Sequence, residues 1–401
     1  MRIVLIPSTY PPRQGGVETA SHALACQFAS GSHEVIVVTN RYPRCLPARE
    51  MIDGISIHRT LFLSPNVRHI NNRRPDLFFA SLFFYPSTSH YITKVVKDFR
   101  PDIINVHFPD CQIPFVLSLR RRYRFKLVVS LHGHEILRWL EVNGPSETIS
   151  PALTRDKGLR RLRTILDQAD EVTACSQYLL ERAVALEGSV AHKCHVIQNG
   201  VDYKLLTQER PFIQQRPFVF ACGRLTRTKG FDLLLEAFAR IATGNSDVDL
   251  IIAGDGECRT KLEAQADSLG ITPRVKFQGW VEPRRVAQFL SGCFFVVVPS
   301  RQETFGITAL EAVATGTPLV ATRVGGMPEF LNAKSWSSPV LLVDASADQI
   351  AEGLSRMLDG LSTQHSNHRE TRHLVPFEYT WEHVAHKYLA IYEGDARCRS
   401  S

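Results

Sequence analysis

Two segments in the second half of the chain combine charged side chains with glycines at a spacing suited to a diphosphate. Residues 223–230 begin and end with glycine and carry Arg224 and Lys229. Arg224 follows an apolar run that predicts a strand, and Lys229 precedes an amphipathic stretch that predicts a helix. Two cations near the positive end of a helix favour phosphate. The alternative is a solvated basic turn, and the Gly-Lys-Ser/Thr of a Walker A loop is missing.

The second segment, residues 299–312, contains two glutamates separated by seven residues. Glu303 follows a predicted buried strand, and Glu311 lies one turn inside a predicted helix. Glu311 could accept hydrogen bonds from ribose hydroxyls, and Glu303 from hydroxyls of a transferred sugar. The alternative for Glu311 is a surface glutamate, which its apolar neighbours disfavour. Three backbone amides at the start of this helix are expected to hold phosphate or sugar oxygens: those of Phe305, Gly306 and Ile307.

The pattern of the whole chain indicates how these loops are positioned. Short β-branched runs alternate with amphipathic stretches, which predicts βαβ units and parallel sheets. Strands are expected at residues 2–6, 34–39, 103–106, 126–131, 171–174, 218–222, 248–253, 275–277, 294–298, 319–321 and 340–343. Helices are expected, among others, at residues 19–29, 87–99, 159–169, 231–241, 307–315 and 380–392. Open parallel sheets bind ligands beyond the carboxyl ends of their strands, where both charged segments are placed.

The chain is expected to form two doubly wound α/β domains that face each other across a cleft. Each half begins with a strand, a glycine-bearing loop and a helix. A polar, glutamine-rich linker at residues 204–217 separates a domain at 1–203 from a domain at 218–376. The last segment, 377–401, is expected to be an amphipathic helix that crosses back to the first domain, followed by a tail.

Composition excludes several classes of protein. The 401 residues are 44% hydrophobic and 22% charged, which is ordinary for globular proteins, and no apolar run is long enough to span a membrane. The first residues resemble a buried strand more than a secretory signal. Nine cysteines are scattered singly, without zinc-finger spacing, which indicates reduced thiols in a cytoplasmic protein. Residues 1–200 hold 25 Lys and Arg against 17 Asp and Glu, whereas residues 201–401 hold 22 against 23, so the first half is expected to meet something anionic.

Together the two charged segments resemble glycosyltransferase family 4, a group of nucleotide-sugar-dependent enzymes with the GT-B fold. Further matches follow in the family's order along nearly the whole chain: Gly15-Gly16-Val17-Glu18, Leu131-His132-Gly133, residues 172–176, residues 196–202 with Asn199, Gly254-Asp255-Gly256, Phe277-Gln278-Gly279 and residues 324–329. One match is weak, whereas a series of matches in the family's order is specific. At Gln198 and Thr304 other residues are commoner in the family. These two differences concern which nucleotide sugar serves as the donor.

The resemblance implies a fold of two Rossmann-like domains and a retaining transfer of a hexose-type sugar. The donor would be a UDP- or GDP-sugar, and the acceptor, bound by the N-terminal domain, a glycan or lipid-linked acceptor of the cell envelope. It implies front-face attack, in which the departing phosphate helps to deprotonate the acceptor. Four catalytic residues are expected: His132, Glu303, Arg224 and Lys229. The expected donor-binding residues are Gly15, Gly16, Asn199, Gly279, Phe305, Gly306, Ile307 and Glu311.

Two assignments leave an alternative open. A histidine at a strand end, such as His132, is often a satisfied core group, and His134 and Glu135 compete with it for the active-site role. Asp247-Val248-Asp249 matches the metal signature of another glycosyltransferase fold. It precedes a strand, at the wrong end of the sheet, so we expect neither a metal nor another cofactor.

Three basic stretches suggest a membrane surface: residues 68–74, 120–124 and 155–163. Beside the first lies the apolar run 77–85, which is too short to span a bilayer but suits its interface. The hypothesis is therefore a cytoplasmic protein, peripheral at the inner face of the plasma membrane. The alternative is a core helix with solvated arginines. Two other functions also stay open, a nucleotide-sugar epimerase of the same fold and a basic nucleic-acid-binding protein, although no nucleic-acid-binding motif is present.

Overall fold

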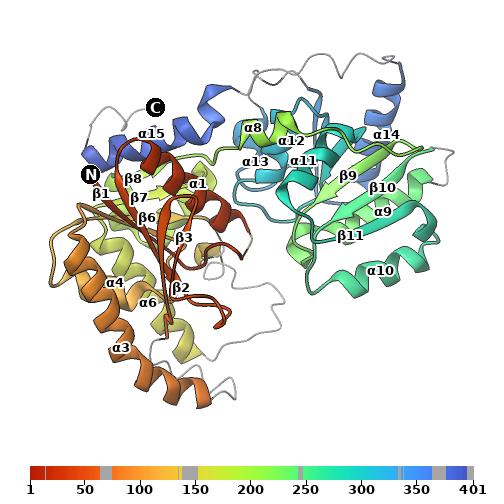
Figure 1. Ribbon diagram of the computed structural model, residues 1–401. Coiled ribbons are helices and arrows are strands. Elements are labelled where there is room, and N and C mark those ends of the chain that lie inside the picture. The colour runs from red at the N-terminus through yellow and green to blue at the C-terminus, as the bar shows by residue number, and fades with distance from the viewer. Residues whose placement is uncertain are drawn as a thin grey trace. The chain divides into compact units, whose positions relative to one another are not determined.

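The protein divides into two compact units. The computed structural model describes residues 1–13, 15–63, 75–133, 135–137, 152–242, 247–332, 336, 338–363 and 376–394. Unit 1 comprises Met1–Asn199 together with Trp381–Ser401, and unit 2 comprises Gly200–Thr380. Figure 1 shows a central sheet with helices in each unit.

Unit 1 is built on an eight-stranded sheet in the order β3-β4-β2-β1-β5-β6-β7-β8. The strands are β1 (Arg2–Pro7), β2 (Glu34–Asn40), β3 (Arg49–Ile52), β4 (Ile55–Thr60), β5 (Ile103–His107), β6 (Lys126–Leu131), β7 (Glu171–Ala174) and β8 (Cys194–Val196). All neighbours pair in parallel except β3 and β4, which form an antiparallel hairpin. The expected strands of this half are confirmed, and β3, β4 and β8 are additional.

Helices cover both faces of the unit 1 sheet. They are α1 (Gly16–Ser30), α3 (Pro75–Phe99), α4 (Ile113–Arg120), α6 (Ala152–Gln168), α7 (Gln177–Leu186) and α15 (Trp381–Glu393). Figure 1 shows α1 and α15 side by side, in agreement with their contacts. From α15, Trp381, Tyr388 and Tyr392 pack into one apolar cluster with Leu5 of β1 and Phe28 of α1.

A chain of polar contacts also joins α15 to three strands. Asn105 of β5 donates from Nδ2 to the Tyr392 hydroxyl at 2.7 Å and accepts from the Ser130 hydroxyl at 2.8 Å. Thr173 of β7 donates to Ser130 at 2.9 Å and lies 3.2 Å from the Tyr388 hydroxyl. Because the inner members of this chain are fully buried, each depends on the others for its hydrogen bonds. The last helix of the chain is therefore part of the core of unit 1.

Unit 2 has a six-stranded sheet in the order β11-β10-β9-β12-β13-β14, with every neighbouring pair parallel. Its strands are β9 (Phe218–Cys222), β10 (Asp249–Ala253), β11 (Val275–Gly279), β12 (Phe295–Val298), β13 (Leu319–Thr322) and β14 (Val340–Val343). Its helices are α8 (Tyr203–Gln208), α9 (Phe231–Ala242), α10 (Arg259–Ser268), α11 (Pro283–Gly292), α12 (Ile307–Ala314), α13 (Met327–Leu331) and α14 (Ala347–Thr363). Helix α8 lies within the stretch expected to be a linker.

Alternation along β9 explains why helices pack on both faces of this sheet. Val219 and Ala221 join the apolar cluster formed with α9 and α14, whereas Phe220 stacks on Phe289 of α11 with ring centroids 5.1 Å apart. A strand buried on both sides shows the continuous apolar run that the sequence has here. Among the described residues, no helix combines the length and the hydropathy needed to cross a bilayer.

Candidate functional site

The strand order places the candidate donor site of unit 2 at a topological switch point. Strand β9, the first of this sheet, lies between β10 and β12, so the connections from β9 and β12 leave toward opposite sides. The loop after β9 carries Arg224 and Lys229, and the loop after β12 carries Glu303. The two loops are joined directly, because the backbone amides of Arg301 and Gln302 donate to the Thr228 carbonyl at 2.8 and 3.2 Å.

Lys229 and Glu303 form an ion pair within this joined loop structure. The same Glu303 oxygen, Oε2, lies 3.5 Å from the Ser300 hydroxyl, and Oε1 accepts from the Thr304 backbone amide at 3.2 Å. The Glu303 side chain is 13% exposed and that of Lys229 31%. Because the Glu303 carboxylate is nearly buried, its hydrogen-bond donors hold it in place. The Lys229 ammonium is more exposed and remains accessible to a ligand.

Close backbone approaches fix the loop that carries Glu303. Gly230 has a φ of +67° and would bring a Cβ to 2.0 Å from the Pro299 carbonyl oxygen. Gly325 has a φ of +58° and would bring a Cβ to 1.5 Å from the Glu303 carbonyl oxygen. Only glycine fits these positions, so the loop is clamped from two sides.

Helix α12 brings a second acidic group and free amides to the same end of the sheet. Its first residue is Ile307, and Gly306 precedes it with a φ of +100°. The buried Phe305 ring stacks on Phe330 at 4.9 Å, which anchors the approach to the helix. The amides of the first turn have no partner within the helix itself, so they are available to an anion.

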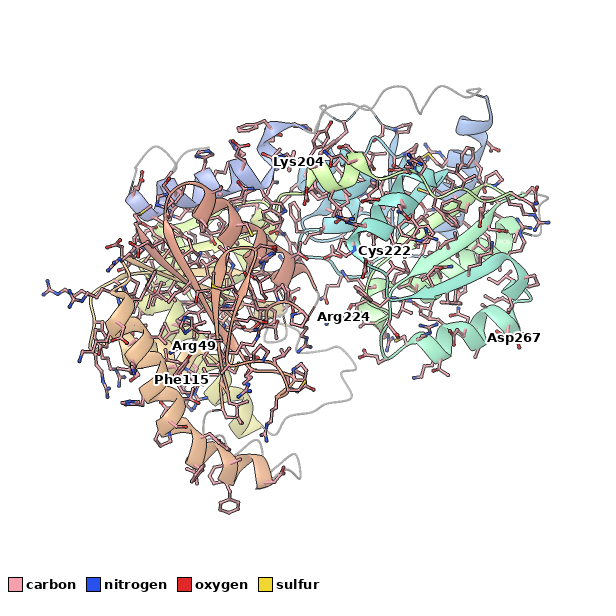
Figure 2. All side chains as sticks on the ribbon, viewed as in Figure 1. Arg49, Phe115, Lys204, Cys222, Arg224 and Asp267 are labelled. Carbon is pink, nitrogen blue, oxygen red and sulfur yellow. The ribbon has the colours of Figure 1, made fainter. Side chains whose placement is uncertain are left out.

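Glu311 and Lys229 both shift the pKa of Cys222, the last residue of β9. Burial, followed by the charge of Glu311, raises the pKa of the Cys222 thiol to about 12, and Lys229 opposes this. Burial also raises the pKa of the Glu311 carboxyl to about 7. Cys222 and Arg224 are labelled in Figure 2 where β9 ends. The structure thus groups the charged residues expected from the sequence, with Gly279 two strands away at the end of β11.

In unit 1, the loop between β1 and α1 carries the predicted Gly15 and Gly16. Gly16 is the first residue of α1, and Gly15 precedes it in an extended conformation. The nearby Glu18 is buried and accepts a hydrogen bond from the Thr9 hydroxyl at 2.6 Å. Arg13 also lies 3.9 Å from this carboxylate. Glu18 therefore ties the loop to the first turn of the helix.

His132 directly follows β6 and is held by backbone contacts. Both carboxylate oxygens of the fully buried Glu135 accept from backbone amides, one from His132 and the other from Gly133 at 2.9 Å. This gives Glu135 a structural role, while His134 lies outside the described residues. Burial lowers the pKa of His132 to about 4, so its ring is neutral at physiological pH. Asn199, the last residue of unit 1 before the chain enters unit 2, is largely buried.

Comparison with known proteins decides the family. The model described as Glycosyltransferase Family 4 matches residues 14–205, and the model described as Glycosyl transferases group 1 matches residues 204–373. The chain belongs to glycosyltransferase family 4. It is 28% identical to an uncharacterized glycosyltransferase of Methanocaldococcus jannaschii over 98% of each chain. It is 26% identical to a GDP-mannose-dependent phosphatidylinositol monomannoside mannosyltransferase of Corynebacterium glutamicum over 78% of this chain and 81% of the relative.

Solved structures agree on the fold of this family 4 glycosyltransferase. Sucrose-phosphate synthase from Thermosynechococcus elongatus superposes with a TM-score of 0.78 at 21% identity, covering 98% of this chain and 99% of that one. The Anabaena protein HepE, in complex with UDP-glucose, superposes with a TM-score of 0.72 at 19% identity, covering 98% and 100%. The expected pair of Rossmann-like domains of the GT-B class is confirmed.

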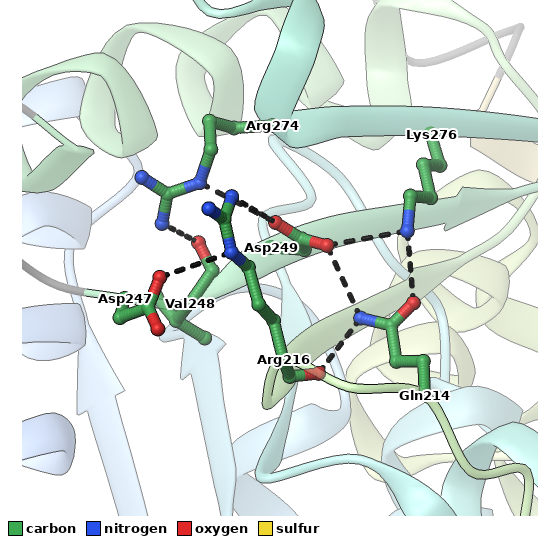
Figure 3. A network of polar contacts seen from close by, with 7 residues as sticks. All are labelled: Gln214, Arg216, Asp247, Val248, Asp249, Arg274 and Lys276. Carbon is green, nitrogen blue, oxygen red and sulfur yellow. Dashed lines mark hydrogen bonds and ion pairs between the residues drawn. The ribbon is translucent and has the colours of Figure 1, made fainter.

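The Asp-x-Asp segment of the glycosyltransferase takes part in an ion-pair network at the amino end of β10 (Figure 3). Asp249 is buried and lies 3.3 Å from Arg274 Nε and 3.2 Å from Lys276 Nζ. Asp247 lies 3.1 Å from Arg216 Nε. Cations of the protein already compensate these carboxylates, at the edge of the sheet opposite the candidate site. Gln214 also donates to Asp249 at 3.2 Å, which attaches the segment before β9 to the sheet.

Sequence reasoning overlooked two contributions to the sites. Arg301 forms two hydrogen bonds, of 2.5 and 2.7 Å, with the Asp232 carboxylate at the start of α9. Burial alone would raise the pKa of Asp232, but the hydrogen bonds and charge of Arg301, with backbone hydrogen bonds, lower it. This fork secures the loop after β12 to the helix after β9. His107, the last residue of β5, lies beside His132 with its Nδ1 atom 3.1 Å from His132 Nε2. A histidine at the end of a buried strand, like His132 directly after β6, was the available signal.

One cluster of potential metal ligands was also not foreseen from the cysteine spacing. His22, Cys26 and Asp53 place one donor atom each within 4.8 Å of one another. Hydrogen bonds account for the histidine, since its Nδ1 lies 2.8 Å from the Tyr10 hydroxyl and its Nε2 lies 2.9 Å from Asp53. The cluster thus connects the loop after β1, helix α1 and the β3–β4 hairpin.

Proposed function

We propose that this enzyme transfers a hexose-type sugar from a nucleoside diphosphate sugar to a glycan or lipid-linked acceptor, with retention of anomeric configuration and without a metal ion. The observation that carries the proposal is the Lys229–Glu303 ion pair, clamped between two joined loops at the switch point of unit 2. The cell-envelope role of the product is part of the proposal.

The charges of unit 2 suit the departure of a nucleoside diphosphate. Arg224 and Lys229 would neutralise the diphosphate, and the first amides of α12 would hold its oxygens. Glu303 would accept from hydroxyls of the sugar, and Glu311 from the ribose. Fixed positive charge at the leaving group would then perform the task that a divalent cation performs in other transferases. Dialysis against a chelator should leave turnover unchanged, and a loss restored by Mg²⁺ or Mn²⁺ would contradict metal independence.

Retention requires that the new bond forms on the face from which the phosphate departs. The acceptor oxygen bonds to the anomeric carbon as the carbon–phosphate oxygen bond breaks, and the acceptor proton passes to the departing phosphate oxygen. A neutral His132 would support this step by a hydrogen bond to the sugar, since its pKa of about 4 makes it a poor base at neutral pH. NMR of the first product would show the donor's anomeric configuration, and an inverted product would contradict this step.

The donor can be identified by binding before any acceptor is known. Relatives include enzymes named for GDP-mannose, and HepE was solved with UDP-glucose, so both bases are to be tried. A true donor at 100 times its dissociation constant adds about 2.7 kcal/mol of stability. We expect one nucleotide sugar to raise the melting temperature of wild-type protein but not of Lys229→Ala. Equal stabilisation of both proteins would contradict the assigned site.

A lipid-linked acceptor is supported by the exposed apolar side of helix α3. The residues expected as a short apolar run lie in the first half of this helix, where Phe79, Leu82 and Phe83 are 65%, 49% and 79% exposed. The basic stretch 68–74 and the side chain of Arg155 lie outside the described residues, whereas Arg121 and Arg122 are exposed. Exposed aromatic side chains, together with exposed cations of the same unit, suit an anionic bilayer surface.

Sedimentation with vesicles tests the membrane part of the proposal. Wild-type protein should sediment with vesicles containing anionic phospholipid at low salt, and the Phe79→Ser/Phe83→Ser variant should remain in the supernatant. Phe377→Ser is the matched control, because Phe377 is 58% exposed in unit 2. Absence of wild-type sedimentation would contradict membrane binding and would leave sugar transfer to a glycan untouched.

A further inference from the structure

His107 is a buried residue whose position is fixed by its own backbone. It is fully buried at the end of β5, and its carbonyl oxygen accepts from Gln112 Nε2 at 3.1 Å and from the Ser8 amide at 3.2 Å. Its ring lies 5.4 Å from that of His132, centroid to centroid, with an interplanar angle of 33°. The only contact between the two rings that has hydrogen-bond geometry joins His107 Nδ1 to His132 Nε2, at 3.1 Å.

The hydrogen bond between the two rings contains one hydrogen atom, which belongs to one ring or to the other. Burial lowers the pKa of both imidazoles, and the neighbouring His132 lowers that of His107 further, so both rings are neutral at physiological pH. A neutral imidazole carries one N–H and one bare nitrogen. Either His107 Nδ1–H donates to His132 Nε2, or His132 Nε2–H donates to His107 Nδ1.

The other nitrogen of His107 distinguishes the two arrangements. His107 Nε2 is buried and has no hydrogen-bond partner among the residues that the structure describes. If His132 were the donor, His107 would carry its proton on Nε2, as a buried N–H without an acceptor. Buried unpaired N–H groups are rarer in proteins than acceptors with an unused lone pair. If His107 is the donor instead, its Nε2 atom carries only an unused lone pair.

We propose that His107 is a positioning residue that donates from Nδ1 to His132 Nε2 and thereby holds the proton of His132 on its Nδ1 atom. In this tautomer the basic nitrogen of His132, Nε2, is occupied by His107, and its Nδ1 atom carries the N–H. His132 acts on the sugar of the proposed transfer by hydrogen bonding and takes no proton from the acceptor. This consequence rests on the proposed function, whereas the tautomer itself does not.

Nitrogen NMR tests the tautomer on the protein without any substrate. The whole chain, labelled with ¹⁵N in its histidines, should show a protonated Nδ1 and an unprotonated Nε2 for His132, assigned by comparison with His132→Gln. In His107→Leu the His132 signals should move toward a mixture of the two tautomers. A protonated Nε2 on His132 in the wild-type protein would overturn the proposal.

Kinetics test the consequence for transfer. His107→Asn places an amide donor where Nδ1 stands, and His107→Leu removes the donor. We expect His107→Leu to lower kcat about tenfold with little change in KM for the donor, and His107→Asn to recover most of the loss. His58→Asn is the matched control, because His58 is a half-buried histidine on strand β4 of the same sheet.

The outcomes separate this proposal from the function on which it rests. Equal kcat in His107→Leu and the wild-type protein, or equal loss in the Asn and Leu variants, would overturn the positioning role. If the wild-type protein transfers no sugar from any nucleotide donor, the proposed function fails, and the ¹⁵N spectrum still decides the tautomer.

Discussion

The two units share the order of six neighbouring strands but hold their candidate site residues in different ways. In each, the first strand lies at the switch point of a mainly parallel sheet. Unit 2 fixes its charged residues through backbone contacts, since Gly230 and Gly325 lie against the loop that carries Glu303. Unit 1 fixes the neutral His132 through buried side chains, namely Glu135 and His107.

This difference suits the different charge of what each unit is proposed to bind. A diphosphate needs cations that do not reorganise when it arrives, and a loop clamped by glycines supplies fixed positions. A sugar without charge needs directional hydrogen bonds, which neutral rings with a defined proton position supply. The contrast predicts that unit 2 is sensitive to added atoms and unit 1 to lost hydrogen bonds.

The strongest test of the clamp in unit 2 is Gly325→Ala. A Cβ 1.5 Å from the Glu303 carbonyl, at a φ of +58°, forces the loop to move. We expect the free energy of unfolding to fall by more than about 3 kcal/mol, with loss of transfer. Gly360→Ala is the control, because its site is helical and, among the described residues outside its own helical turn, no atom lies within 4 Å of the added Cβ. Equal stability of the two variants in urea denaturation would contradict the clamp.

Charge in unit 2 is tested separately by Lys229→Ala, which removes the ammonium group that pairs with Glu303. We expect transfer to fall at least about a hundredfold, about 2.7 kcal/mol of transition-state stabilisation, while the circular dichroism spectrum stays unchanged. Lys261→Ala, an exposed lysine on helix α10, should behave as wild type. Unchanged turnover in Lys229→Ala would remove the mechanism proposed for the leaving group.

For unit 1, the dependence on hydrogen bonds is tested by Tyr392→Phe. The hydroxyl that accepts from Asn105 Nδ2 at 2.7 Å is lost without a change of shape. We expect thermal denaturation to show a loss of about 1–3 kcal/mol, because the buried amide loses that acceptor. Tyr42→Phe, with a ring 62% exposed, should be neutral. A neutral result for both variants would show that α15 docks through apolar contacts alone.

The smallest expected effect concerns the protonation of Glu311 in unit 2. Burial raises its pKa to about 7, so between about pH 4.5 and 7 the folded state holds a proton that the unfolded state has released. The free energy of unfolding should therefore decrease as the pH rises through this range, by at most about 1.4 kcal/mol per pH unit. Glu311→Gln, which resembles the protonated form, should lack this part of the decrease. Parallel pH curves for the two proteins would contradict a raised pKa.

Strand positions in both units followed from short apolar runs. Strands β6, β7, β9 and β14 have the predicted bounds, because each contains a short run of apolar or β-branched residues. The β3–β4 hairpin was missed, although Asp53-Gly54 is a turn signal and both residues have positive φ. Its strands are only four and six residues long, and the first has two charged residues followed by two apolar ones, so neither strand shows a clear alternation.

For the candidate sites, the sequence predicted charged residues better than their supports. Arg224, Lys229 and Glu303 stand beside glycines at a recognisable spacing, and the structure places them on neighbouring loops. The partners Asp232 and His107 were not predicted, because each acts through one contact with a residue far away in the chain. A single sequence contains no sign of which distant side chains meet.

The docking of α15 has a consequence for biosynthesis. Synthesis begins with unit 1, but the apolar cluster around Phe28 is incomplete until α15 adds residues such as Trp381, Tyr388 and Tyr392. Unit 2 is continuous from Gly200 to Thr380, so all its residues are synthesised before these three residues of α15. The later-encoded domain is thus the first to have all its residues, and the nascent N-terminal half waits, with one face uncovered, for the last helix to arrive.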